Sequence, residues 1–144
     1  MPLIMDRVSR PPRKNKRVQL NAEFLDAAEE KDLLRAGKLL EKGANPNARD
    51  WLSHETALKY AAWQNNSEMV RFLLENKANP NYSGSEGNTP LHDAVLFNSM
   101  DAARVLLENK ANPRLKNEDG HTPADLARQR NYKEILKLIE HHSK

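Results

Sequence analysis

The stretch that decides the fold reads Gly87-Asn88-Thr89-Pro90-Leu91-His92-Asp93-Ala94. Partial copies of it lie 33 residues to either side, as Thr56-Ala57-Leu58 and as Thr122-Pro123-Ala124. Threonine is a good N-cap residue, and proline at the next position suits the first turn of a helix, where its missing N–H is not needed. The spacing therefore predicts a short helix that begins at the same point of each repeated unit.

Two further landmarks keep the same phase. The triplet Ala44-Asn45-Pro46 recurs at 78–80 and at 111–113. An alanine followed twelve residues later by leucine or isoleucine occurs four times: Ala27 and Leu39, Ala61 and Leu73, Ala94 and Leu106, Ala127 and Ile139. Apolar residues at three- and four-residue spacing predict a second, longer helix in each unit. In the last three units these apolar residues are Met69, Val70, Leu73 and Leu74; Ala102, Val105 and Leu106; and Ile135, Leu138 and Ile139. Three markers in one phase predict four helix–turn–helix units.

The residues at the ends of the expected helices indicate left-handed backbone. Asparagine, which tolerates that conformation, follows the first helix of three units (Asn65, Asn98, Asn131). Lys77 and Lys110 stand where Gly43 ends the second helix of the first unit. We expect both lysines to be left-handed, at a cost of roughly 1 kcal/mol each.

This pattern resembles that of the ankyrin-repeat family. The resemblance covers the chain after residue 20 and implies an all-α ankyrin-repeat solenoid with short projecting hairpin loops. Its repeats are expected at about 21–46 (repeat 1), 47–80 (repeat 2), 81–113 (repeat 3) and 114–144 (repeat 4). The family fold confers no catalysis by itself and implies a concave surface that binds other macromolecules, usually proteins.

Departures from the family pattern are concentrated in three repeats. Repeats 1 and 4 are atypical, as expected of terminal repeats with one flank in water. Gly37 lies inside the second helix of repeat 1 and costs about 1 kcal/mol relative to alanine. In repeat 2, Lys59 replaces the family histidine and His54 replaces a glycine. We expect marginal stability, with repeat 1 fraying first.

The composition excludes several classes of site. The 144 residues contain no cysteine, so a disulfide framework, a thiolate zinc site and a cysteine nucleophile are excluded. The apolar runs are too short to span a membrane, and the opening residues 1–5 are too short for a signal peptide. We therefore expect a cytoplasmic or nuclear protein that is not secreted.

The basic residues are concentrated at the N-terminus. Residues 1–20 hold six lysines and arginines and one aspartate, and the rest of the chain is slightly acidic. We expect residues 1–20 to form a flexible basic arm and residues 21–144 to form the repeat domain. Four basic residues in the arm resemble a monopartite nuclear import signal: Arg13, Lys14, Lys16 and Arg17. Contact with nucleic acid or acidic membranes, or an inert tail, are the alternatives, and the acidic body argues against nucleic-acid binding by the repeats.

Catalytic and metal-binding patterns are weak. The resemblance assigns His92 to a capping network between neighbouring turns. His141-His142 has no carboxylate or thiolate partners at metal-ligand spacing, and no serine or threonine comes with a base and an orienting acid. We predict no catalytic residue, no cofactor and no metal.

The resemblance implies that residues late in the first helix of each repeat line the concave face. The expected contact residues are Glu29, Glu30, Tyr60, Trp63, Asp93, Leu96, Phe97 and Arg130, with Trp51 at a hairpin tip. An aromatic centre bordered by charge is typical of a protein-binding hot spot. We expect the rings to anchor a partner protein and the three acids to select a basic or apolar segment of it. Burial of Trp63 or Phe97 between helices is the alternative.

The leading hypothesis is a non-catalytic adaptor or inhibitor, monomeric on its own, that binds a partner protein. One alternative is a nuclear or chromatin-associated adaptor whose arm contacts nucleic acid or an import receptor. A second is a pathogen effector that mimics host ankyrin scaffolds, and a third is a self-associating structural solenoid. Ankyrin readers of histone tails share Thr89 to Ala94, but Tyr60 stands where their pocket needs an acid.

Overall fold

The computed structural model describes residues 15–143. Within that range the chain forms eight α-helices and one short 3-10 helix: α1 (Lys16–Glu29), α2 (Leu33–Glu41), α3 (Ala57–Trp63), α4 (Ser67–Glu75), η2 (Ser85–Gly87), α5 (Pro90–Leu96), α6 (Met100–Glu108), α7 (Pro123–Arg130) and α8 (Lys133–His142). Each repeat supplies two α-helices, which confirms the predicted solenoid of four helix–turn–helix units.

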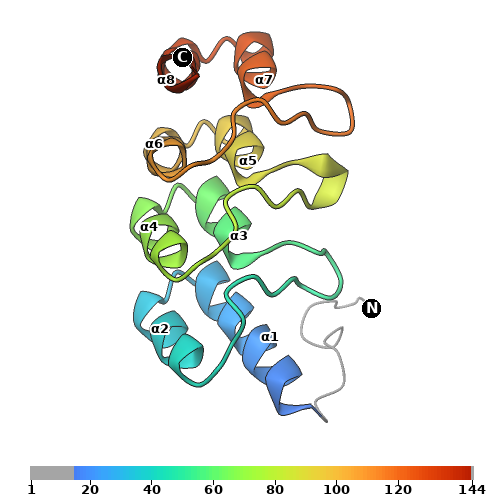
Figure 1. Ribbon diagram of the computed structural model, residues 1–144, viewed down its shortest axis with the longest axis vertical. Helices are drawn as coiled ribbons and strands as arrows, with labels where there is room; N and C mark the ends of the chain where they lie inside the picture. Colours follow the sequence, from blue (N-terminus) through green and yellow to red (C-terminus); the bar gives the residue numbers. More distant parts are fainter. Residues whose placement is uncertain (1–14, 144) are drawn as a thin grey trace.

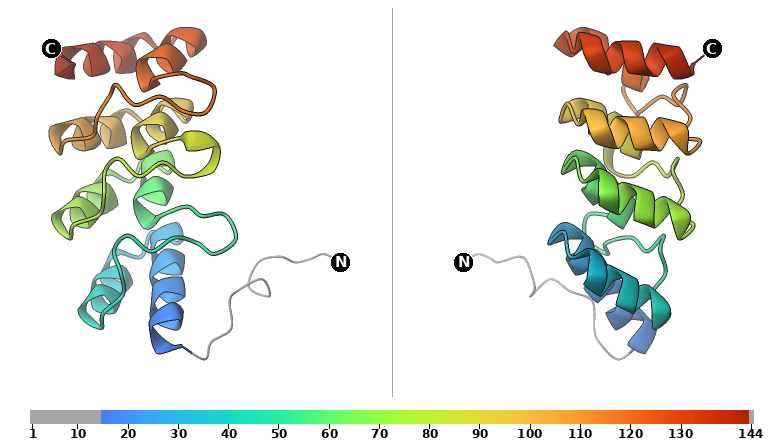
Figure 2. Two further views of the ribbon diagram at one scale, coloured as in Figure 1. Left: turned by 45° about the vertical axis from the view of Figure 1, so that its right-hand side comes forward. Right: turned by 90° about the vertical axis from the view of Figure 1, so that its left-hand side faces the viewer.

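The helices stack in two rows. The first helices of the repeats, α1, α3, α5 and α7, pack one on the next, and the second helices α2, α4, α6 and α8 lie beside them (Figure 1). The loops that lead into α3, α5 and α7 project away from the stack (Figure 2). The N-terminal ends of α3, α5 and α7 are therefore next to the projecting loops, and their C-terminal ends face away from them.

The helix starts follow from the sequence landmarks. Thr56, Thr89 and Thr122 cap α3, α5 and α7, each accepting a hydrogen bond from the backbone N–H three residues later. The cap satisfies one of the four N–H groups that have no partner inside a helix. Threonine thus fixes where each first-row helix begins, and the equal spacing aligns those starts in the stack.

The expected left-handed residues are confirmed. Lys77 has a φ of 73° and Lys110 one of 74°, in the place of Gly43. His54, the replacement for a glycine, has a φ of 64°. The three asparagines after the first helices are also left-handed (Asn65, Asn98, Asn131).

Small residues let the first-row helices approach closely. Ala27, Ala61, Ala94 and Ala127 are fully buried at equivalent positions of the four repeats. Second-row helices contribute the larger core residues Met69, Leu73, Leu106, Ile135 and Ile139. The alanines set the spacing between repeats and the larger residues fill the space between the two rows.

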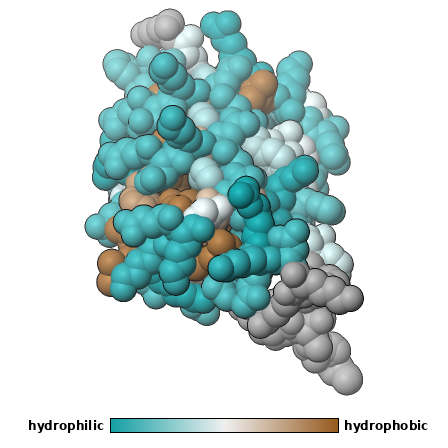
Figure 3. Space-filling model, turned by 60° about the horizontal axis from the view of Figure 1, so that its bottom comes forward, coloured by the Kyte–Doolittle hydropathy of each residue, from teal (hydrophilic) through white to brown (hydrophobic). Residues whose placement is uncertain are grey.

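The N-terminal end of the stack is less well covered than the middle. Leu34 on α2 is 71% exposed, and Leu20, Leu33 and Leu40 are only partly buried. Apolar side chains interrupt the polar surface at this end (Figure 3). This poorer cover is in line with the early fraying expected of repeat 1, which stays a prediction.

The predicted boundary of the arm is wrong for its last residues. Lys16 and Arg17 lie in the first turn of α1, because the Asn15 side chain accepts hydrogen bonds from the N–H groups of Arg17 and Val18. Leu20 then packs against the core. Arg13 and Lys14 lie outside the described residues. No helix in the described part of the chain is long and apolar enough to cross a membrane.

Candidate functional site

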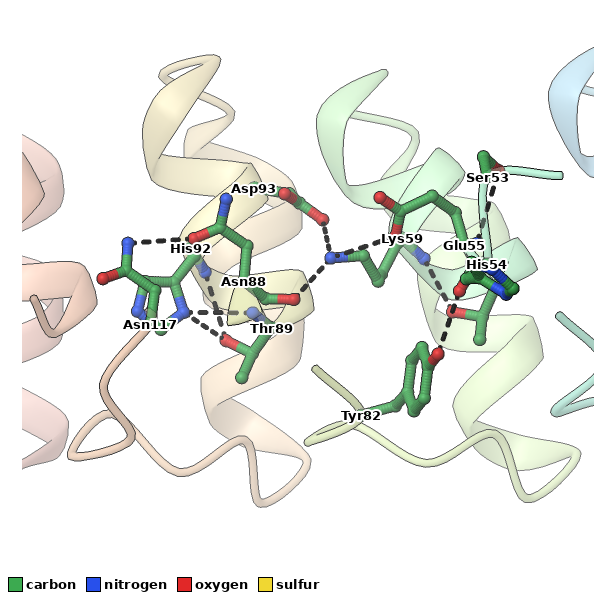
Figure 4. Close-up of polar contacts among 11 residues, drawn as sticks. Ser53, His54, Glu55, Lys59, Tyr82, Asn88, Thr89, His92, Asp93 and Asn117 are labelled. Carbon is green, nitrogen blue, oxygen red and sulfur yellow. Dashed lines mark hydrogen bonds and ion pairs between the residues drawn. The ribbon is translucent and has the colours of Figure 1, made fainter. Parts of the chain in front are cut away.

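A charged cluster is buried between repeats 2 and 3. It consists of Glu55, Lys59 and Asp93, and we call it the ion cluster. The Lys59 side chain is fully buried, and its Nζ lies 2.8 Å from Oδ2 of Asp93 and 3.2 Å from Oε1 of Glu55. The same Nζ donates a hydrogen bond to the backbone carbonyl of Asn88 (Figure 4). One ammonium therefore links α3 to both α5 and the loop that precedes α5.

The ion cluster carries more negative than positive charge. Neither of the two carboxylate oxygens that face Nζ has a hydrogen bond to another described residue. Burial raises the pKa of Asp93 to about 6, because the apolar surroundings penalise the charged carboxylate more than Lys59 stabilises it. Two carboxylates share one cation, so the cluster is held at an electrostatic cost.

Asp93 is not the exposed charge selector that the sequence pattern predicted. It is 6% exposed and is paired with Lys59. The equivalent residues of the neighbouring repeats, Tyr60 and Leu126, are buried as well. This position faces the adjacent helix and not the solvent, so its side chain serves packing between repeats.

Lys59 does in repeat 2 what histidine does in repeat 3. His92 accepts a hydrogen bond from the N–H of Thr89 through Nδ1, and its Nε2 lies 2.9 Å from the backbone carbonyl of His121. Lys59 reaches the carbonyl of Asn88, which is the equivalent of His121 one repeat earlier. Both side chains satisfy a loop carbonyl of the next repeat.

The equivalent carbonyl of repeat 2 belongs to Glu55 and accepts a 2.8 Å hydrogen bond from the backbone N–H of Asp50. The residue equivalent to Lys59 in repeat 1 is Leu25, whose side chain has no polar group that could reach it. The hydroxyl of Tyr82, in the loop that precedes α5, donates to the carbonyl of the neighbouring His54 at 2.9 Å (Figure 4). Tyr82 thus adds a second polar link between repeats 2 and 3.

His92 has the structural role that the resemblance implied. It forms a capping box with Thr89 and is fully buried. Burial lowers the pKa of His92, so the ring is neutral at pH 7. Among the described residues there is no group of three or more His, Asp or Glu side chains that could hold a metal ion.

Exposed rings lie at the other ends of the same two helices. The last residue of α3 is Trp63, and Phe97 is the C-cap of α5. Their ring centroids are 6.2 Å apart with an interplanar angle of 31°. Phe97 is 61% exposed, whereas Trp63 and Leu96 are half-buried. Trp63, Leu96 and Phe97 together form an apolar surface that we call the ring patch.

Tyr60 supports the ring patch from inside but is not an open anchor. It is 9% exposed and packs edge-on against Trp63, with centroids 4.9 Å apart. Burial raises the pKa of the Tyr60 hydroxyl to about 12. The expectation that Tyr60 stands open to a partner is therefore wrong, because its position faces the neighbouring helix.

Charged residues flank the ring patch along the C-terminal ends of the first-row helices. On one side, the carbonyl of Glu29 at the end of α1 accepts a 2.8 Å hydrogen bond from Gln64, next to Trp63. Glu30 is exposed and pairs with Arg35 at 3.2 Å. On the other side, Arg130 donates to the carbonyl of Leu96 at 3.4 Å. The ring patch thus lies between the Glu30–Arg35 ion pair that follows α1 and Arg130 at the end of α7.

Trp51 does not belong to this surface. It is half-exposed in the loop that leads into the N-terminal end of α3, whereas the ring patch lies at the C-terminal end. The Asp50 carboxylate accepts hydrogen bonds from the N–H groups of Leu52 and Ser53, which holds the loop in shape. Trp51 and Leu52 therefore form a separate exposed apolar tip.

Sequence reasoning missed the ion cluster. Lys59 was recognised only as a replacement for histidine. The available signal was its position: a lysine in the buried phase of the repeat needs a carboxylate, and Asp93 occupies the next position of the following repeat. Glu55, four residues before Lys59, supplies a second one.

The comparisons with known proteins agree with this architecture. A family model for ankyrin repeats (3 copies) matches residues 24–117 and 85–144. Over 57 residues the chain is 42% identical to the E3 ubiquitin-protein ligase KEG of Arabidopsis thaliana. That match covers 40% of this chain and 4% of the relative, so the chain spans only a small part of that protein's length. Repeat phase, threonine caps and the family match together show that this chain belongs to the ankyrin-repeat family.

Proposed function

We propose that this protein is a non-catalytic binding module that captures a segment of a partner protein on the ring patch. Ankyrin repeats generally mediate protein–protein interaction. The observation that carries the proposal is Phe97, which is 61% exposed yet held against Trp63. Large exposed apolar groups on a rigid framework are typical of interaction sites, because few side chains have to be ordered on binding.

The charges on either side of the ring patch suggest the chemistry of the bound segment. Its apolar or aromatic centre would cover Trp63 and Phe97, and its basic end would face Glu29 and Glu30. Its other end would face Arg130. Charge complementarity of this kind sets the orientation of a segment more than its affinity.

The test is selection of binding peptides from a random library on the wild-type protein. Affinities of the selected peptides are then measured for the double variant Trp63→Ala/Phe97→Ala. We expect a loss of about tenfold or more, the effect of removing a hot spot worth at least 1.4 kcal/mol. We also expect the selected peptides to combine apolar residues with lysine or arginine toward one end.

The matched control is Leu34→Ala, which truncates an exposed leucine on α2, in the other row of helices. It removes exposed apolar area without touching the ring patch and should leave peptide affinity unchanged. Peptides that bind the double alanine variant as well as the wild type would contradict the proposal.

A further inference from the structure

The ion cluster and the ring patch belong to the same helix–helix junction. Lys59 and Trp63 are four residues apart on α3, and Asp93 and Phe97 are four residues apart on α5 and its cap. Residues at this spacing lie on one face of a helix, one turn apart. Lys59 meets Asp93 across the junction, and Trp63 meets Phe97 across it about 5 Å further along.

Asp93 is the acid through which Lys59 holds α5. Glu55, the other acid, belongs to the same repeat as Lys59 and lies just before α3. If the Asp93 carboxylate took up a proton, Lys59 would keep Glu55 as its charged partner, and the cluster would hold one positive and one negative charge. The packed junction favours this neutral form of Asp93, because burial of its carboxylate costs more than the pairing with Lys59 returns.

We infer that Lys59 and Asp93 are a positioning pair for the ring patch, and that loss of the proton from Asp93 loosens the contact between Trp63 and Phe97. The inference rests on the proposed function of the ring patch as the binding surface. Packed interiors transmit small displacements. A shift of α5 against α3 at the ion cluster therefore also displaces the Trp63 and Phe97 rings, which lie one helical turn further along. Binding at the ring patch would thereby respond to pH.

The surroundings of Asp93 favour protonation in a mildly acidic range. Burial is the largest cause of its raised pKa of about 6, and Lys59, the nearby cation, opposes it. Two other acids, Glu55 before α3 and Glu86 in η2, raise the pKa of Asp93 further.

Most other charged side chains on the helices packed against α5 are engaged elsewhere. On α6, Arg104 pairs with Asp101, and Glu108 is exposed at the C-terminal end of the helix. On α7, Arg128 pairs with Asp125, and Arg130 donates to the carbonyl of Leu96. In the loop before α7, the backbone carbonyl of His121 lies 2.9 Å from Nε2 of His92.

The test uses tryptophan fluorescence of the whole protein. The chain has two tryptophans, so Trp51→Phe leaves Trp63 as the single reporter inside the ring patch. Acrylamide quenching of Trp63 is followed from about pH 8 to about pH 4, with circular dichroism to confirm that the helices persist. We expect quenching to increase as the pH rises through about 6, in a single transition.

Three variants in the Trp51→Phe background identify the titrating group. Asp93→Asn should abolish the transition, and Glu55→Gln should move its midpoint to lower pH, because one of the acids that raise the Asp93 pKa is gone. Asp101→Asn, an exposed acid on α6, should leave the midpoint in place. No transition in the Trp51→Phe protein, an unchanged transition in Asp93→Asn, or an unchanged midpoint in Glu55→Gln would overturn the inference.

The outcome is separable from the test of the proposed function. The titration needs no partner, so it can fail while Trp63→Ala/Phe97→Ala still abolishes peptide binding. Conversely, the transition can be present in a protein whose ring patch binds no peptide. If both succeed, affinity of a selected peptide should fall as the pH rises above 6 in the wild type and stay level in Asp93→Asn.

Discussion

The N-terminal and C-terminal ends of α3 and α5 differ in the kind of side chain that is buried and the kind that is exposed. At the N-terminal ends an ammonium and two carboxylates are buried, whereas at the C-terminal ends Phe97 is exposed and Trp63 is only half-buried. Burying charged groups lowers the stability of the fold, and an exposed ring does not contribute the stabilisation that its burial would give. Both departures occur at one junction, as expected if this part of the stack serves the recognition role that we propose at the expense of stability.

The largest effect should come from removing the cation of the ion cluster. Lys59→Met leaves Asp93 and Glu55 buried without a counter-charge, so we expect the free energy of unfolding in urea to fall by about 3–5 kcal/mol at pH 7. The control is Arg104→Ala, which breaks a surface pair with Asp101 and should cost about 1 kcal/mol or less. Equal losses for the two variants would show that the ion cluster is not a buried charge site.

A smaller effect is expected in the pH dependence of stability. The pKa of Asp93 is about 6 in the folded protein and near 3.8 when unfolded, so the folded state binds the extra proton between these values. The Asp93 contribution to stability is therefore present below pH 4 and is lost as the pH rises to 6, by about 2 kcal/mol.

His92 also makes the stability depend on pH: because its pKa is lowered in the folded protein, its contribution to stability rises with pH up to about 6.5. That contribution is the same in wild type and Asp93→Asn, so the difference between the two proteins isolates the Asp93 contribution. The free energies of unfolding of wild type and variant are measured in urea at each pH. The wild-type value minus the variant value should fall between pH 4 and pH 6. A difference that stays flat or rises would contradict the raised pKa.

Overpacking the ion cluster should cost about 1–3 kcal/mol. A Cβ added at Gly84 would lie 2.4 Å from Oε1 of Glu55 and 3.2 Å from Cε of Lys59, so Gly84→Ala must displace the cluster. Gly37→Ala is the matched substitution, since its Cβ would meet only the Phe72 ring at 3.4 Å or more. We expect Gly37→Ala to be neutral or to stabilise the protein by up to about 1 kcal/mol in thermal or urea unfolding.

The smallest effect on stability is expected at the ring patch. Phe97→Ala removes a ring that is mostly in water, so the free energy of unfolding should change by less than about 1 kcal/mol. A loss of 3 kcal/mol or more, as for a core phenylalanine, would show that Phe97 is a packing residue. The contrast between the two ends of α5 would then disappear.

The repeat phase could be predicted from the sequence because it rests on local chemistry. Threonine caps, apolar spacing and left-handed residues such as Lys77 each depend on a few neighbouring residues. The same phase also identified Trp63 and Phe97 as late first-helix residues, which the structure leaves at least partly open.

What the sequence did not predict depends on contacts between repeats. The repeat pattern places Tyr60 and Asp93 at equivalent positions. How deeply their side chains are buried depends on how closely α3 and α5 pack. The pairing of Lys59 with Asp93 joins residues 34 positions apart. The start of α1 at Lys16 depended on a single cap, Asn15, within a run of basic residues.

The most direct test of the division between the two ends compares binding and stability in one variant. Affinity of a peptide selected on the wild type is measured for Phe97→Ala by titration calorimetry, beside its free energy of unfolding. We expect affinity to fall about tenfold or more while stability changes by less than about 1 kcal/mol. Unchanged affinity, or a loss of affinity that only follows unfolding, would contradict the assignment of the exposed rings to recognition.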